Sequence, residues 1–99
     1  MKIPREMLER MKQYSPFYQA VWKACAAIPA GQVRTYGWIA RHIGKPNAAR
    51  AVGRALGRNP FAPTIPCHRV VGADGKMTGY SGKGGIATKR MLLKNEGAF

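Results

Sequence analysis

The residues most suggestive of chemistry surround Cys67, which stands between Pro66 and His68 in an apolar, β-rich run. Cysteine acts as a nucleophile in its thiolate form, and the neighbouring His68 and Arg69 side chains can favour that form. The alternative is structural, because a single cysteine is most often a small buried hydrophobic residue. Adjacent strand residues face opposite sides, so His68 would reach the sulfur only through a local turn or a bridging water. These residues alone leave both interpretations open.

The other cysteine and histidine residues do not complete a metal site. Cys25, His42, Cys67 and His68 show neither the C-x-x-C nor the H-x-x-x-H spacing of common zinc ligands. Cys25 also falls on an apolar stripe with the spacing of a helix face that packs into a core. We therefore expect no metal, and a core position for Cys25.

The charge of the chain is strongly one-sided, because 17 Lys and Arg residues oppose four acidic residues and give a formal net charge of +13. Such a field attracts polyanions, and nucleic acid is the first candidate. A membrane surface would favour a long basic amphipathic helix or a lipidation signal, and we find neither. No apolar run approaches the roughly 20 residues of a membrane span. Two cysteines are few for a secreted scaffold of this size, so we expect a reducing cytoplasm.

A second candidate site is a slim basic helix near the middle of the chain. Polar residues recur there at three- and four-residue spacing and would share one helix face: Asn47, Arg50, Arg54 and Arg58. The remaining positions are mostly small, namely Ala48, Ala49, Ala51, Val52 and Ala55. Such a helix fits a DNA groove, where arginines reach phosphates or base edges. The alternative is an ordinary solvated helix face, and the net charge favours DNA.

Caps and breaks predict the helices that would position these residues, over residues 1–12, 16–28, 36–43 and 48–56. Ser15, Thr35 and Asn47 are the predicted N-caps, and a proline follows Ser15 at the first helical position. A glycine-containing turn at residues 44–46 joins the last two helices. Two short helices joined in this way predict a helix-turn-helix.

The C-terminal part is predicted as an extended run, a turn, a return strand, a glycine-rich loop and a final helix, over residues 64–71, 73–75, 76–77, 78–85 and 86–95. We therefore expect an α/β, mainly helical fold: a winged-helix-like DNA-binding domain with a helix-turn-helix and a short β-hairpin. The chain length predicts a single domain over residues 1–99, with residues 1–14 as an N-terminal extension.

Seven short motifs also occur in the order found in one protein family. They are Phe17-Tyr18-Gln19-Ala20-Val21-Trp22, Gly31-Gln32-Val33-Arg34-Thr35-Tyr36, Ala49-Arg50-Ala51-Val52-Gly53, Asn59-Pro60, Ile65-Pro66-Cys67-His68-Arg69-Val70-Val71, Gly79-Tyr80-Ser81-Gly82 and Leu92-Leu93-Lys94-Asn95-Glu96-Gly97. With them, the chain from Pro16 to Gly97 resembles the O6-alkylguanine-DNA alkyltransferases, also called methylated-DNA–protein-cysteine methyltransferases. The resemblance is to the C-terminal catalytic domain only, because members often carry an additional N-terminal domain.

The resemblance implies a catalytic group. Cys67 would accept the alkyl group, with His68 as a water-linked base and Glu96 orienting that histidine. Tyr36 would meet the guanine ring from its minor-groove edge and help to neutralise the leaving purine. Each role has a structural alternative; Glu96, for example, could simply pair with a neighbouring lysine or arginine.

The resemblance also implies how the DNA is held. Arg50 would fill the base stack after the damaged nucleotide has left it, and Ala49 and Arg54 belong to the same DNA-binding helix. Asn59 resembles the hinge residue that joins this helix to the active-site strand. A simple turn cap remains the alternative for Asn59.

Recognition of the extruded base would involve the backbone around Val70 and the side chain of Ser81, with Tyr80 as a wall of the alkyl pocket. Two departures from the family pattern bear on this pocket. Ala62 stands where some members have a proline, and the loop at residues 81–85 is slightly longer than usual. The alanine affects the tolerance of bulky adducts, and the longer loop affects closure of the pocket.

The expected function is repair of O6-alkylguanine in double-stranded DNA, by base flipping and irreversible, single-turnover alkyl transfer to Cys67. We expect a monomer without cofactor or metal, in the cytoplasm and associated with the nucleoid. The runner-up is a non-enzymatic alkyltransferase-like protein that binds the lesion and signals to other repair pathways. Cys67 and the Tyr80-Ser81-Gly82 loop argue against it. A plain winged-helix regulator would explain the arginines but not Pro66-Cys67-His68.

Overall fold

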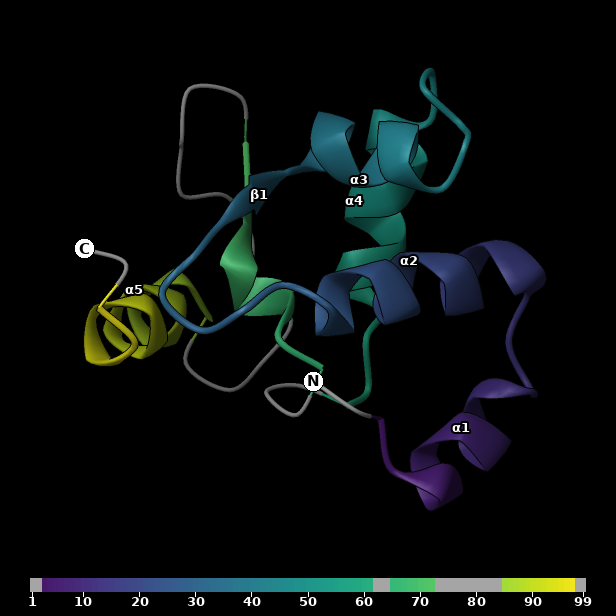
Figure 1. The fold of residues 1–99 in the computed structure, drawn as a ribbon, viewed down its shortest axis with the longest axis horizontal. Helices are drawn as coiled ribbons and strands as arrows, with labels where there is room; N and C mark the ends of the chain where they lie inside the picture. Colours follow the sequence, from purple (N-terminus) through teal and green to yellow (C-terminus); the bar gives the residue numbers. More distant parts are fainter. Residues whose placement is uncertain (1–2, 62–64, 73–84, 98–99) are drawn as a thin grey trace.

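The computed structural model describes residues 3–61, 65–72 and 85–97 (Figure 1). In chain order the elements are α1 (Arg5–Met11), α2 (Pro16–Ala26), β1 (Arg34–Thr35), α3 (Tyr36–His42), α4 (Ala49–Gly57), the 3-10 turn η1 (Cys67–Arg69), β2 (Val70–Val71) and α5 (Gly85–Asn95). Helices α2, α3 and α4 pack on one another, whereas η1 contacts both α2 and α5. The expected mainly helical α/β fold is confirmed. The turn η1 lies between the group of α2, α3 and α4 on one side and α5 on the other.

Two of the three predicted N-caps are confirmed. The side-chain oxygens of Ser15 and Thr35 each accept a hydrogen bond from the backbone N–H three residues later, at 3.2 and 3.0 Å. Such bonds satisfy donors that a helix leaves without an intrahelical partner. The predicted cap at Asn47 is wrong, because the N-cap of α4 is Ala48 and no side chain caps it. The Ala48 N–H donates to the Lys45 carbonyl oxygen at 2.9 Å, and this turn delays the helix start by one residue.

Helices α3 and α4 form the helix-turn-helix that the sequence predicts. Gly44 ends α3 with φ at +78°, a left-handed conformation that favours glycine. The Lys45 N–H then donates to the carbonyl oxygen of Ala40, a fully buried residue, at 2.8 Å. Within the described ranges no helix is long and apolar enough to cross a membrane.

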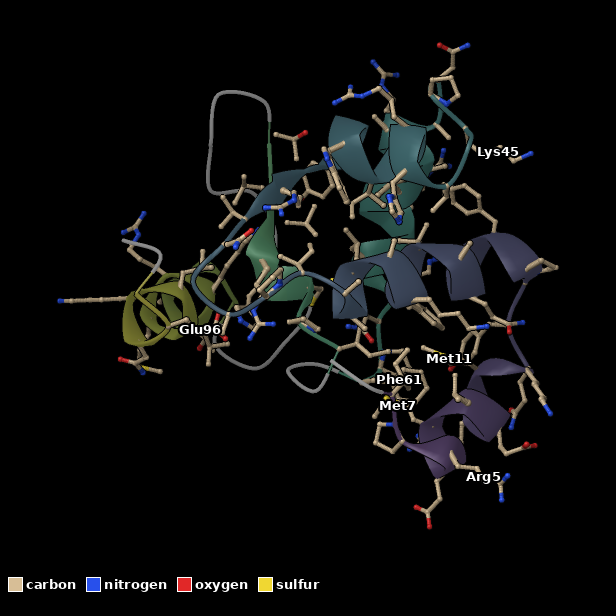
Figure 2. The ribbon with its side chains drawn as sticks, in the orientation of Figure 1. Arg5, Met7, Met11, Lys45, Phe61 and Glu96 are labelled. Atoms are coloured by element: carbon tan, nitrogen blue, oxygen red, sulfur yellow. The ribbon has the colours of Figure 1, made fainter. Side chains whose placement is uncertain are left out.

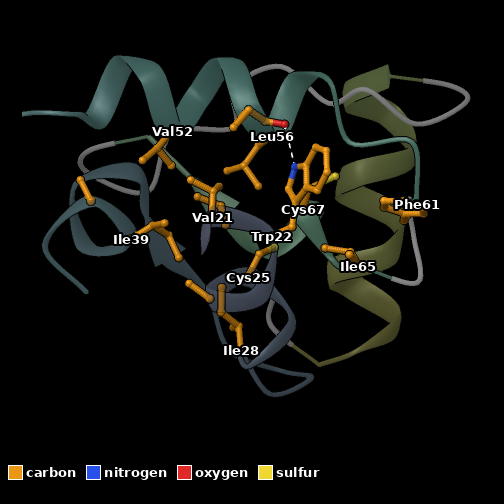
Figure 3. Packing of buried hydrophobic residues seen from close by; sticks show 14 of the residues in the cluster. Val21, Trp22, Cys25, Ile28, Ile39, Val52, Leu56, Phe61, Ile65 and Cys67 are labelled. Atoms are coloured by element: carbon orange, nitrogen blue, oxygen red, sulfur yellow. Dashed lines mark hydrogen bonds between the residues drawn. The ribbon is translucent and has the colours of Figure 1, made fainter. Parts of the chain in front are cut away.

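The core lies between α2, α3 and α4 and centres on Trp22, which is fully buried (Figure 3). Its indole Nε1 donates to the Ala55 carbonyl oxygen at 2.8 Å and so ties α2 to α4. Phe61 packs edge-on against the indole with ring centroids 5.7 Å apart. Cys25 is fully buried in the same cluster, so its predicted core position is confirmed.

Helix α1 packs onto this core through Met11, which is fully buried (Figure 2). The Arg10 guanidinium lies 5.0 Å from the centre of the Phe61 ring, a cation–π contact at the edge of the same cluster. The segment predicted as an N-terminal extension therefore shares the core of the chain.

Strands β1 and β2 pair in parallel, with Arg34 opposite Val70. Because β1 leads directly into α3 and β2 directly follows η1, this pairing places the start of the helix-turn-helix beside the segment that carries Cys67. The predicted return strand at residues 76–77 lies outside the described residues.

Candidate active site

Cys67 opens η1, a turn of 3-10 helix, where the sequence pattern predicts an extended run over residues 64–71. That prediction is wrong at Cys67–Arg69, where backbone bonds of 2.8 and 2.9 Å donated by Cys67 and Arg69 coil the chain. Pro66 has no N–H with which to continue a strand ladder. A local turn is one of the two arrangements that would bring His68 towards the sulfur.

His68 and Arg69 share a single carboxylate, that of Glu96. His68 Nε2 lies 3.1 Å from both carboxylate oxygens, and Arg69 Nε donates to Oε1 at 2.9 Å. A second Arg69 nitrogen, Nη2, donates to Oε2, while Nη1 donates to the Ile28 carbonyl oxygen at 2.8 Å. Glu96 therefore holds both residues that follow Cys67, and Arg69 anchors the group to the end of α2. Cys67 and His68 themselves are only 5% and 2% exposed.

The approach of Glu96 depends on Gly31, in the segment between α2 and β1. Gly31 has φ at +87°, and a Cβ atom there would lie 3.1 Å from the backbone oxygen of Glu96. Any other residue would press on the turn that follows α5 and would also strain the backbone. A glycine far away in the sequence thus leaves the space in which Glu96 meets His68.

Burial and charge set the protonation states of this group. The hydrogen bond from Arg69 lowers the pKa of Glu96, helped by His68 and opposed by partial burial, so the carboxylate stays ionised near pH 7. Burial lowers the pKa of His68 below its ordinary value of 6.5, although Glu96 opposes this shift. His68 is therefore neutral at pH 7. Because a carboxylate only accepts, Nε2 carries the proton and Nδ1 is the basic nitrogen.

Lys89 on α5 is a residue of this site that the sequence patterns do not single out. It is fully buried, and its Nζ donates to the Val70 carbonyl oxygen at 2.7 Å. Burial lowers its pKa, while the thiols of Cys67 and Cys25 act in the opposite direction. The spacing of the sequence could have identified Lys89, because Lys89, Leu93 and Glu96 recur at i, i+4 and i+7 and so share one helix face.

Cys25 is more deeply buried than Cys67. Burial raises the pKa of the Cys25 thiol far above its ordinary value, and the neighbouring Cys67 raises it further. Cys25 is therefore held as a neutral thiol and is a poor nucleophile. Among the described residues, no group of three or more His, Cys, Asp or Glu side chains gathers as a metal site would.

The remaining candidate residues divide between α3 and α4. Tyr36 is the first residue of α3 and is half-buried against α4, where its ring lies 4.0 Å from the position of a Cβ on Gly53. Arg50 and Arg54 are exposed on α4, and Ala49 begins that helix. Tyr36 thus meets the helix that carries Arg50. Tyr80, Ser81 and Ala62 lie outside the described residues.

Asn59 connects α4 to the segment that leads to Cys67. It is 5% exposed; its Nδ2 donates to the Ile65 carbonyl oxygen at 3.0 Å, and its Oδ1 accepts from the Phe61 N–H at 2.9 Å. Both polar atoms of the side chain thus bond backbone on the path to η1. The arrangement is a brace between the helix-turn-helix and the cysteine turn.

The structure thus joins a helix-turn-helix through the Asn59 brace to buried Cys67 and His68 and to the partly buried Glu96 carboxylate, which defines a DNA-binding domain that carries a cysteine site. The chain belongs to the 6-O-methylguanine DNA methyltransferase family, whose DNA-binding domain model matches residues 16–98. A methylated-DNA–protein-cysteine methyltransferase of Salmonella typhimurium is 49% identical over 92 residues, which are 93% of this chain and 53% of that protein. One of Mycobacterium bovis is 60% identical over 80 residues, which are 81% and 47%. The chain spans about half the length of these curated relatives.

Solved structures show the same similarity. The Mycobacterium tuberculosis protein named OGT, in complex with DNA, superposes with a TM-score of 0.81 at 56% identity, covering 86% of this chain and 52% of that one. S. pombe Atl1, in complex with damaged DNA containing O6-carboxymethylguanine, superposes with a TM-score of 0.73 at 37% identity, covering 82% and 75%.

Proposed function

We propose that this chain repairs O6-alkylguanine in double-stranded DNA by transferring the alkyl group irreversibly to its own Cys67. The observation that carries the proposal is the cysteine turn, in which His68 follows Cys67 and is held by the Glu96 carboxylate at 3.1 Å. Family membership supports the reaction class, and the relatives at 49 and 60% identity are named for it. The related structure in complex with DNA supports DNA as the partner.

In the proposed reaction, neutral His68 takes the thiol proton of Cys67 at Nδ1 through a bridging water. The Glu96 carboxylate then stabilises the resulting imidazolium. The sulfur attacks the alkyl carbon, the bond from that carbon to O6 breaks, and its electron pair stays with the purine. The Tyr36 hydroxyl protonates the departing guanine. The imidazolium then releases the thiol proton to water and the tyrosinate takes a proton from water, so that the net change is one proton moved from the thiol to the purine. The product is a thioether without a good leaving group, so each molecule reacts once.

The lesion has to leave the duplex before this chemistry can occur. Extrusion of a base costs a few kcal/mol, on the order of one lost stack. Arg50 is exposed on a helix of mostly small residues and would enter the gap, which offsets part of that cost. Every group used in this reaction comes from one chain, so we propose that the protein acts as a monomer and without a cofactor. Its proposed place of action is the DNA of the nucleoid.

The intact mass of the protein after incubation with a duplex containing O6-methylguanine tests the proposal. We expect a gain of one methyl group per molecule, located on the peptide that contains Cys67. Cys67→Ala should gain none and still bind the lesion, whereas Cys25→Ala is the matched control and should react normally. Methylation mapped to Cys25 would show that the assigned nucleophile is wrong.

The second candidate is a lesion-binding protein without activity, and the similarity to S. pombe Atl1 bound to damaged DNA favours considering it. Presence of the cysteine between Pro66 and His68 supports the enzyme instead. The same mass measurement separates the two, because a protein that binds the methylated duplex for hours without gaining mass is a sensor.

A further inference from the structure

The outer side of α3 carries an aromatic and cationic cluster that the proposed reaction does not use. The Trp38 indole stacks on the His42 ring, with centroids 4.8 Å apart and planes 12° from parallel. The Arg34 guanidinium lies 5.2 Å from the centre of the same indole. Arg34 is in turn held by bonds to Gln32 Oε1 and the Val33 carbonyl oxygen at 2.8 and 2.9 Å. These contacts hold the Arg34 guanidinium beside the indole without a ligand.

A hollow of about 350 Å³ lies beside this cluster, where β1 leads into α3. Its lining consists of three apolar side chains, one threonine and two arginines: Val33, Trp38, Val71, Thr35, Arg34 and Arg41. Gly37 leaves space for one of the arginines, because a Cβ there would lie 3.4 Å from Arg41 Nη1. The guanidinium of Arg41 can therefore fold back towards the first turn of α3.

Among the described residues that line the hollow there is no carboxylate to neutralise its two arginines. From residue 10 to residue 73 the chain contains neither Asp nor Glu, so every lining residue comes from an acid-free stretch. Apolar walls next to two guanidinium groups match a ligand that is flat and apolar in one part and anionic in another. A free anion would not use the apolar walls, and an uncharged apolar ligand would not use the arginines.

A nucleotide in a single strand has this combination of a stackable base and a phosphate, and single-strand binding sites use the same pairing of aromatic and basic groups. A paired nucleotide is excluded, because its base is enclosed in the duplex stack. We propose that this hollow binds one unpaired nucleotide of DNA, with the base against the apolar wall formed by Val33, Val71 and Trp38 and the phosphate between Arg34 and Arg41. This proposal rests on the proposed function, because both take DNA as the ligand. Val71, which lines the hollow, belongs to β2, the strand that directly follows the Cys67 turn.

Tryptophan fluorescence gives a direct test, because the chain has two tryptophans and Trp22 is fully buried. Titration with a short oligothymidylate should quench the emission of Trp38 to saturation. The affinity of R34Q/R41Q for this single strand should depend less on salt, with the slope of log Kd against log salt reduced by about 0.7. That value follows from roughly 0.7 counterions released per single-strand phosphate contact.

The matched control is R5Q/K12Q, which removes the same formal charge near α1, on the far side of α2 from α3 (Figure 1). It should leave the single-strand salt slope unchanged. If R34Q/R41Q does not fold, R41Q alone, at an exposed position, should lower the slope by less than about 0.7, in the same direction. Absence of quenching, or equal loss of single-strand and duplex affinity, would overturn the proposal. Because these are binding measurements, they stand whether or not methyl transfer to Cys67 is observed.

Discussion

Lys89 and Val70 are joined by a 2.7 Å hydrogen bond from the lysine ammonium to the backbone carbonyl oxygen, although neither side chain is exposed. A buried charge is costly unless it is compensated, so burial lowers the pKa of Lys89, and the neighbouring Cys67 sulfur opposes this shift. The bond fixes the strand that follows the cysteine turn and places a positive charge near the proposed nucleophile.

Replacement of Lys89 by methionine should therefore slow alkylation of Cys67 by iodoacetamide at neutral pH by about tenfold. Loss of one nearby positive charge disfavours the thiolate, and one unit of thiol pKa changes the thiolate fraction by about that factor. The measurement is the alkylation rate against pH, which should move to higher pH. Lys94→Met, at an exposed position on the same helix, is the control. Identical profiles for both variants would remove Lys89 from the site.

Glu96→Gln should lower the free energy of unfolding by about 1–3 kcal/mol and slow methyl transfer. The change weakens charge-assisted hydrogen bonds to His68 and Arg69 at a carboxylate that is only 18% exposed. Chemical denaturation and single-turnover kinetics measure the two effects. Glu9→Gln is the control, because its ion pair with Lys12 is more than 60% exposed on both sides and should matter by less than about 0.5 kcal/mol. An equal, small effect of both changes would contradict the role given to Glu96.

The pH dependence should reflect the lowered pKa values of His68 and Glu96. Both groups bind protons more weakly in the folded protein than in the unfolded chain, so their contribution to stability is complete above the unfolded values and lost as pH falls through the folded ones. For His68 the loss begins below its ordinary value of 6.5. The rate of methyl transfer should likewise decline with a midpoint below 6.5, because His68 must be neutral to take the thiol proton. His68→Gln should abolish this acid limb, whereas His42→Gln, at an exposed position, should retain it; a midpoint above 6.5 would exclude neutral His68 as the base.

Arg50→Ala should reduce methyl transfer from duplex DNA by roughly tenfold or more, with little change for a free O6-alkylguanine base. Holding the extruded state requires the arginine, and about 1.4 kcal/mol of lost stabilisation corresponds to tenfold. A free base needs no extrusion. Rates with the two substrates give the comparison, and Arg5→Ala on α1 controls for lost charge. Equal losses on both substrates would place Arg50 in support of the fold.

Local chemistry determined those parts of the fold that the sequence predicts well. Ser15 and Thr35 start helices because each side chain bonds an N–H only three residues away, and such bonds form wherever the segment lies. The cap at Asn47 was mispredicted because a backbone turn from Lys45 competes with it. Proline before Cys67 cannot continue a strand ladder, but the sequence pattern did not predict that the chain would coil into a 3-10 turn.

The site itself was decided by tertiary structure. The motif around Cys67 and the basic helix with Arg50 were visible in the sequence, and the family resemblance proposed Glu96 as the partner of His68. Their meeting, however, depends on the space at Gly31, and the burial of Lys89 depends on the packing of α5 against η1. Spacing along a chain specifies which residues share a helix face, whereas desolvation and the contacts between distant segments arise only when the elements pack together.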